Sequence, residues 1–71
     1  MNADTVNAAP PVKLDNTFAY EALASAGLNL ATATMYQAVD AIFNAVLDAR
    51  PGIDEDLADW SAHILAARVM P

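Results

Sequence analysis

The segment 35–48, MYQAVDAIFNAVLD, constrains the fold most, because as a helix it has little surface that suits water. At 3.6 residues per turn its apolar side chains form two adjacent rows, the first made by Met35, Val39, Ile42 and Val46 and the second by Tyr36, Phe43 and Leu47. The remaining stripe is polar and consists of Gln37, Asp40, Asn44 and Asp48. A helix with so much apolar circumference must be covered on more than one side, and a short chain has few elements to do so. The pattern therefore predicts self-association.

Length and composition favour the same interpretation. A chain of 71 residues forms at most one small domain, and a single core of that size is marginal without disulfides, metal or oligomerisation. The chain has no Cys, which excludes disulfides and thiolate metal sites. The chain has three Lys and Arg residues and nine Asp and Glu residues, so its net charge is −6. This charge argues against partners such as nucleic acid or an anionic membrane, which need a basic patch. Oligomerisation is therefore the remaining way to stabilise so small a core.

No targeting or membrane-spanning segment is expected. The first residues, MNADTVNAAPPVKLDN, lack a basic region before an apolar core, as a secretory signal would require. The apolar stretch 18–46 is interrupted by polar residues, whereas a bilayer span needs about 20 mostly apolar residues. We expect a cytoplasmic protein that does not insert stably into membranes as a monomer.

The chain divides into an arm and a helical part. Residues 1–15 are polar, carry two consecutive prolines and show no period, which predicts a flexible or extended N-terminal arm. Residues 16–71 are predicted to form an all-α helical hairpin that self-associates. Asp15, Asn16 or Thr17 is a suitable N-cap for its first helix. Gly27 costs about 1 kcal/mol relative to Ala inside a helix, so one long helix and two shorter ones both fit; we expect one long, bent helix over 17–49.

A second helix follows the Arg50-Pro51-Gly52 stop signal. Asp54 is a good N-cap, Glu55 and Asp56 place negative charge in the first turn, and Arg68 places positive charge in the last. Its larger apolar side chains form a single stripe made by Leu57, Trp60, Ile64 and Leu65. We expect an antiparallel hairpin in which this stripe covers the long helix. The assembly interface is accordingly predicted to consist of both sets, Met35, Tyr36, Val39, Ile42, Phe43, Val46 and Leu47 with Leu57, Trp60, Ile64 and Leu65.

Residues suited to catalysis or metal binding are few. The two serines lie outside any nucleophile turn, and the two glycines form no phosphate-binding loop, so no catalytic and no cofactor-binding residues are assigned. His63 follows Asp59 by four residues and Asp56 by seven, a spacing that fits a solvated polar face, a pH-sensitive histidine or part of a metal site. One His without Cys needs ligands from other chains, so no metal site is assigned.

Carboxylates on the first predicted helix are candidate pH sensors. Asp40 and Asp48 lie on the polar stripe, which either faces water or meets the same stripe of a neighbouring subunit. In the second case protonation would relieve the repulsion between carboxylates, so acid would favour the packed arrangement. Asp59 and His63 are the corresponding candidates on the second helix.

The segment 29–49, NLATATMYQAVDAIFNAVLDA, resembles the R-body structural proteins, the Reb or killing trait family. The likeness lies in a stretch of small residues followed by Met35-Tyr36-Gln37-Ala38 and later by Asn44-Ala45, within residues 16–49. After residue 49 the chain departs from the family's usual Gln-rich run. The resemblance implies a small bacterial subunit that assembles with itself and with homologous subunits into a cytoplasmic ribbon, which in some members extends on acidification.

Two other functions fit the sequence. A small acidic docking or adaptor hairpin would form a discrete oligomer with a protein partner. An antitoxin-like regulator would use its acidic helices to mask a basic toxin or enzyme. A polymer distinguishes the structural subunit from both.

Overall fold

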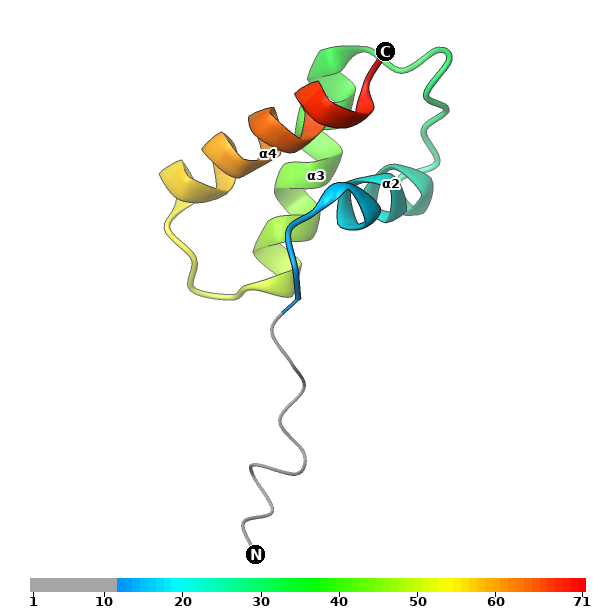
Figure 1. Ribbon diagram of the computed structural model, residues 1–71. Helices are drawn as coiled ribbons and strands as arrows, with labels where there is room; N and C mark the ends of the chain where they lie inside the picture. The colour runs from blue at the N-terminus through cyan, green and yellow to red at the C-terminus, as the bar shows by residue number, and fades with distance from the viewer. Residues whose placement is uncertain (1–11) are drawn as a thin grey trace, which may run out of the picture.

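The computed structural model describes residues 12–71 and contains three helices. These are α2 (Asn16–Ser25), α3 (Met35–Ala49) and α4 (Glu55–Val69) (Figure 1). No strand forms within the described range. The predicted all-α class is confirmed for this part of the chain.

The long helix expected over 17–49 is wrong, because the chain leaves the helical path at Gly27. There φ is +74°, in the left-handed region that favours glycine. The backbone N–H of Leu28 donates to the carbonyl of Leu23 at 3.0 Å, and the N–H of Gly27 donates to that of Ala24 at 3.0 Å. These two bonds are those of a Schellman motif, which satisfies the last carbonyls of a helix. Gly27 therefore ends α2 instead of bending a continuous helix.

Polar residues then organise the connection to α3. The side chain of Asn29 accepts the backbone N–H of Ala31 at 2.8 Å, a local turn that Asn favours. Thr34 and Gln37 form a reciprocal capping box: the Thr34 hydroxyl accepts the Gln37 N–H at 3.0 Å, and the Gln37 side chain accepts the Thr34 N–H at 2.9 Å. A new helix thus begins at Met35 with its own cap.

Substitution of Gly27 tests this break. A Cβ at this position meets nothing within 4 Å, so the cost of Gly27→Ala lies in the backbone conformation. We expect the free energy of unfolding to fall by about 1–2 kcal/mol. Gly27→Asn is the matched control, and it should lose less because Asn tolerates the left-handed region. Chemical denaturation followed by circular dichroism measures both variants. An alanine variant as stable as the wild type would favour a continuous helix.

The link from α3 to α4 is a tight turn. The N–H of Ile53 donates to the carbonyl of Arg50 at 3.1 Å, with Pro51 and Gly52 between them and φ of +90° at Gly52. Pro followed by a glycine of positive φ is the sequence that a type II turn requires. The stop signal expected at this position is confirmed.

The ends of α4 also agree with the prediction from the sequence. Asp54 is its N-cap, and its carboxylate accepts the N–H of Asp56 at 3.4 Å. Glu55 and Asp56 lie in the first turn and Arg68 in the last, which complements the helix dipole.

Two contacts fix the chain where it enters α2. Asp15 is the N-cap, and its carboxylate accepts the N–H of Phe18 at 3.0 Å. The Arg50 guanidinium donates to the carbonyl of Val12 at 2.7 Å and ties this segment to the end of α3. Most of the arm predicted over 1–15 lies outside the described residues.

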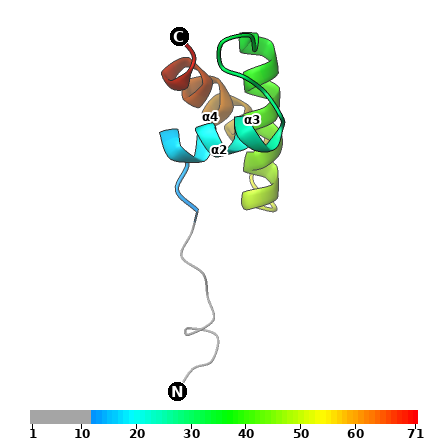
Figure 2. The ribbon, with the colours of Figure 1, turned by 90° about the vertical axis from the view of Figure 1, so that its right-hand side faces the viewer.

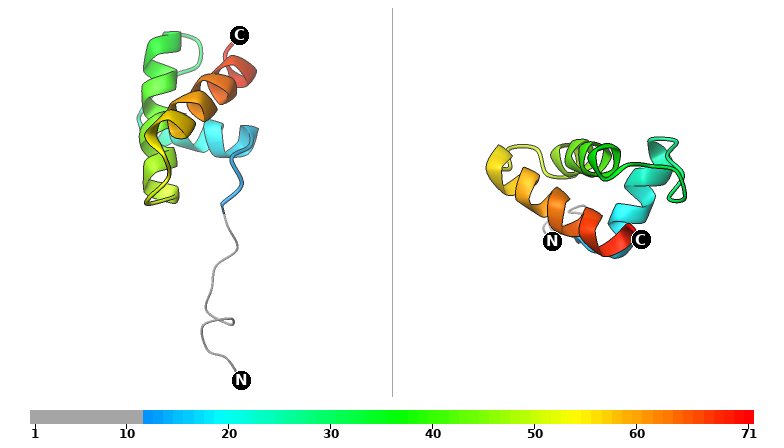
Figure 3. Two further views of the ribbon diagram at one scale, coloured as in Figure 1. Left: turned by 90° about the vertical axis from the view of Figure 1, so that its left-hand side faces the viewer. Right: turned by 90° about the horizontal axis from the view of Figure 1, so that it is seen from above.

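The three helices pack in different directions. α4 runs back obliquely across α3, instead of lying antiparallel along it as the predicted hairpin requires (Figures 1 and 3). α2 lies crosswise beside them and packs against both (Figure 2). The core between the helices contains the buried residues Ala19, Ala22, Leu23, Ala38, Ile42, Val46, Ala58, Ala62, Leu65, Ala66 and Val69. No polar or charged side chain is buried in the part that the structure describes.

The stripe expected to attach α4 to the preceding helix is mostly exposed. Leu57 is 49 % exposed and Trp60 is 63 % exposed, and of this stripe only Leu65 is buried. The helix instead buries the face made by Ala58, Ala62, Leu65, Ala66 and Val69. Short methyl side chains let helices approach closely, whereas a tryptophan on that face would hold them apart. Large side chains on the opposite face are consequently left without cover.

Candidate interaction surfaces

A ridge of apolar side chains runs along the outer face of α4. We define the α4 ridge by Leu57, Trp60, Ile64 and Ala67, whose spacing places them on one side of the helix. Trp60 and Leu57 are exposed, Ala67 is exposed, and Ile64 is half-buried. Arg68 is exposed beside the end of the ridge. An uncovered row of this kind on a small protein is a candidate surface for interaction.

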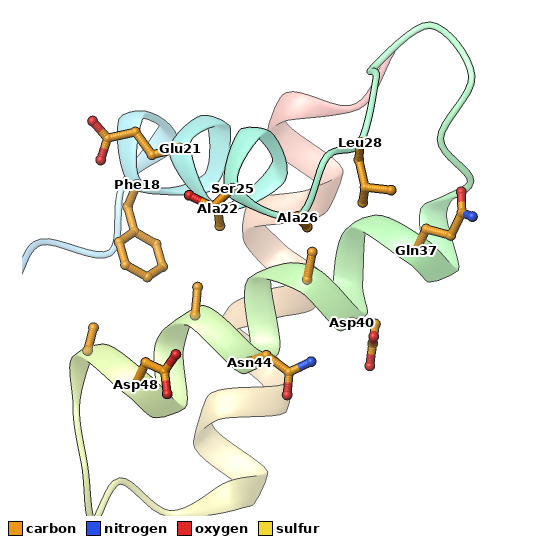
Figure 4. A pocket seen from close by; sticks show the side chains of 13 residues that line it. Phe18, Glu21, Ala22, Ser25, Ala26, Leu28, Gln37, Asp40, Asn44 and Asp48 are labelled. Carbon is orange, nitrogen blue, oxygen red and sulfur yellow. The ribbon is translucent and has the colours of Figure 1, made fainter.

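A groove lies between α2 and α3 and opens away from α4, which passes behind both helices in Figure 4. Its volume is about 700 Å³. We call it the α2–α3 groove, and it is lined by Phe18, Glu21, Ala22, Ser25, Ala26, Leu28, Gln37, Asp40, Ala41, Asn44, Ala45, Asp48 and Ala49. Phe18 and Leu28 lie toward its two ends, and Glu21, Asp40 and Asp48 lie along its rims (Figure 4). Alanines and two larger apolar residues thus form an apolar floor between acidic edges.

A smaller groove lies between α3 and α4. Its volume is about 510 Å³. We call it the α3–α4 groove, and it is lined by Met35, Tyr36, Val39, Asp40, Phe43, Asp59 and His63. Tyr36 is 83 % exposed and Met35 is 47 % exposed. Tyr36 and Phe43, which belong to the second apolar row expected on α3, therefore contribute to this open surface.

The predicted interface residues fall into three environments. Ile42, Val46 and Leu65 are buried in the core of the single chain. Val39, Phe43, Leu47 and Ile64 are half-buried and pack against its edge, whereas Met35, Tyr36, Leu57 and Trp60 are exposed. In the single chain, the exposed and half-buried residues are those that another molecule can contact.

The predicted pH-sensing residues are exposed and divide between the grooves. Asp48 lines the α2–α3 groove, Asp59 and His63 line the α3–α4 groove, and Asp40 borders both. The Nδ1–H of His63 donates to the backbone carbonyl of Asp59 at 2.8 Å, and Nδ1 lies 3.6 Å from the Asp59 carboxylate. Both side chains are more than half exposed, so this contact contributes little to stability.

Sequence reasoning missed the α2–α3 groove and two contributors to it, Phe18 and Leu28. It also missed the small-residue face of α4. Alanines at 58, 62 and 66 follow an i, i+4, i+8 spacing, and this periodic signal was available in the sequence. The groove had no comparable signal, because it exists only when the chain turns at Gly27 and brings α2 back beside α3.

Two further properties concern metal binding and membrane spans. Among residues 12–71, no three His, Cys, Asp or Glu side chains are grouped so that they could hold a metal ion. None of the described helices has the length and apolar character that crossing a bilayer requires.

Comparisons with protein-family models, with curated proteins and with solved structures found no match for the chain.

Proposed function

We propose that this protein is a non-enzymatic structural subunit that packs through apolar helix surfaces into a large cytoplasmic polymer or ribbon. The observation that carries the proposal is the exposure of large apolar side chains on two helices. Tyr36 is 83 % exposed on α3, and the apolar residue Met35 lies next to it. Trp60 is 63 % exposed on α4, and the apolar residue Leu57 lies one turn before it. Covering aromatic residues of this size is a main source of association free energy between proteins.

The distribution of these surfaces favours a polymer over a dimer. A dimer with two-fold symmetry uses the same patch on both subunits. Here the α2–α3 groove opens away from α4, while the α4 ridge lies on the outer face of that helix. Contacts between unlike surfaces propagate unless the rotation between subunits closes a ring.

The resemblance to R-body proteins suggests that the polymer is a ribbon that responds to acid. Glu21 of α2 and Asp40 and Asp48 of α3 line one groove, and Asp59 and His63 of α4 line the other. In neutral solution the net charge of −6 on each subunit opposes close packing of many subunits. Lowering the pH reduces this net negative charge, so closer packing is favoured.

Electron microscopy of the purified protein in negative stain, at neutral pH and at about pH 5 where carboxylates begin to protonate, tests the proposal. We expect ribbons or tubes whose form differs between the two conditions. Replacing Asp40 and Asp48 by Asn should produce the acidic form at neutral pH. Uniform small particles in both conditions, at every protein concentration, would contradict the proposed function.

The acidic rim of the α2–α3 groove favours a second candidate, a docking hairpin for a basic partner helix. Glu21, Asp40 and Asp48 border an apolar floor, which suits an amphipathic helix with Lys or Arg beside its apolar face. This function predicts a discrete complex whose affinity falls with salt. Discrete particles that form only when such a helix is added would favour it over the polymer.

A further inference from the structure

We infer that the α4 ridge of one copy occupies the α2–α3 groove of the next, so that subunits join head to tail. The inference rests on the proposed self-assembly and names the surfaces that would carry it. The occupant of the groove is a second copy of this chain.

The groove is suited to receive a helix because its floor consists of short side chains. Ala22 contributes from α2 and Ala26 from the residue that caps it, and Ala41 and Ala45 contribute from α3. Helix axes approach most closely where the side chains between them are small. The α3–α4 groove is smaller, and Tyr36 and Phe43 line it, so it offers less space for another helix.

The α4 ridge supplies side chains that fit such a floor. Trp60 and Ile64 stand on the outer face of α4, and Leu57 and Ala67 continue the row toward its two ends. Trp60 is the largest uncovered apolar side chain on this helix at 63 % exposed. A tryptophan that enters a pocket at the centre of an interface is a common energetic hot spot.

Charge complementarity supports this pairing of surfaces. The rims of the groove carry Glu21, Asp40 and Asp48, whereas residues 60–70 contain no Asp or Glu in a chain of net charge −6. His63 and Arg68 flank the ridge in that segment. The C-terminal part of α4 is therefore the most favourable part of the described helices to place between acidic rims. Asp56 and Asp59 flank Leu57 and Trp60, so the complementarity in charge is confined to the C-terminal end of the ridge, where Ile64 and Ala67 lie beside Arg68.

The position of the two surfaces determines the form of the assembly. Figure 4 shows α4 behind the helices that form the groove, and no residue of the α4 ridge lines the groove, so one molecule can present both surfaces at the same time. Each subunit can then bind one neighbour with each surface, which is the condition for a head-to-tail filament.

Two variants, each blocked on one surface, test the inference. Asn44→Trp fills the groove from an exposed position on α3, and Trp60→Glu removes the centre of the ridge while adding charge. Sedimentation velocity should show polymer for the wild type and monomer for each variant alone. A one-to-one mixture should form a heterodimer that grows no further, because it joins one intact ridge to one intact groove.

Matched controls separate this interface from general effects. Tyr20→Glu changes an aromatic residue that is 46 % exposed and lies outside the α4 ridge and both grooves, so it should leave the polymer intact. Ser25→Trp fills the same groove from α2 and replaces Asn44→Trp if circular dichroism shows that the latter is unfolded.

The possible results bear differently on the two proposals. A folded groove variant that still polymerises, or a mixture that stays monomeric, would overturn the ridge-in-groove contact and leave the polymer standing. A wild-type protein that is monomeric under all conditions would overturn the proposed function, and this contact with it.

Discussion

Ile42→Ala is expected to lower the free energy of unfolding by about 2–5 kcal/mol, the cost of deleting a large buried aliphatic side chain. Ile42 is fully buried on α3, and the largest fully buried side chains beside it are only Leu23 and Val46. Small domains have a total stability toward the low end of about 5–15 kcal/mol. The variant should therefore lose a large share of the stability of the monomer, as urea denaturation followed by circular dichroism at a concentration where the protein is monomeric would show.

Two variants on the same helix calibrate this result. Ile42→Val removes a single methyl group and should cost about 0.5–1.5 kcal/mol. Tyr36→Ala truncates a side chain that is 83 % exposed, and it should change the stability of the monomer by no more than about 0.5 kcal/mol. If Tyr36→Ala were as destabilising as Ile42→Ala, the assignment of buried and exposed faces on α3 would be wrong.

The helix class and three of the helix ends followed from local chemistry. Asp15 was one of three residues proposed as a cap, and Asp54 and the turn at Pro51 and Gly52 lie where expected. These features depend on hydrogen bonds between residues a few positions apart, so the sequence contains the whole signal.

The break after α2 is more favourable than the cost of Gly27 within a helix indicates. A cost of about 1 kcal/mol leaves a long helix and two short ones nearly balanced. The balance is decided by the bonds gained when the helix ends, which include the Schellman motif at Gly27 and the capping box of Thr34 and Gln37. The pattern Thr-x-x-Gln before an apolar run was visible in the sequence and indicated the start of a helix.

The candidate surfaces were harder to predict, because hydrophobicity alone does not decide which apolar face a helix buries. Trp60 is more apolar than Ala62, yet Ala62 is buried and Trp60 is exposed. In a core made largely of alanine, close approach of the helices decides the outcome, and that depends on the partner helices. Of the residues predicted for the interface, Tyr36 and Trp60 are exposed, whereas Ile42 and Val46 belong to the core of the single chain.

Ala62→Leu tests directly whether close helix packing determines the position of α4. Ala62 is fully buried, so three further carbon atoms have no space unless α4 moves away from the core. We expect a loss of about 1–3 kcal/mol in the free energy of unfolding, the usual cost of overfilling a packed interior. Thermal unfolding followed by circular dichroism would measure the loss as a lower melting temperature.

Ala67→Leu is the matched control, since it makes the same change on the exposed face of the same helix. The helix propensities of Ala and Leu are similar, so its effect on the monomer should stay within about 0.5 kcal/mol. If Ala62→Leu were instead tolerated as well as Ala67→Leu, α4 would not depend on its alanine face. α4 could then rotate about its axis so that Trp60 is buried, and Trp60 would no longer be available to a neighbouring subunit. The stability of the monomer and the surface offered for assembly therefore depend on the same choice of buried face in α4.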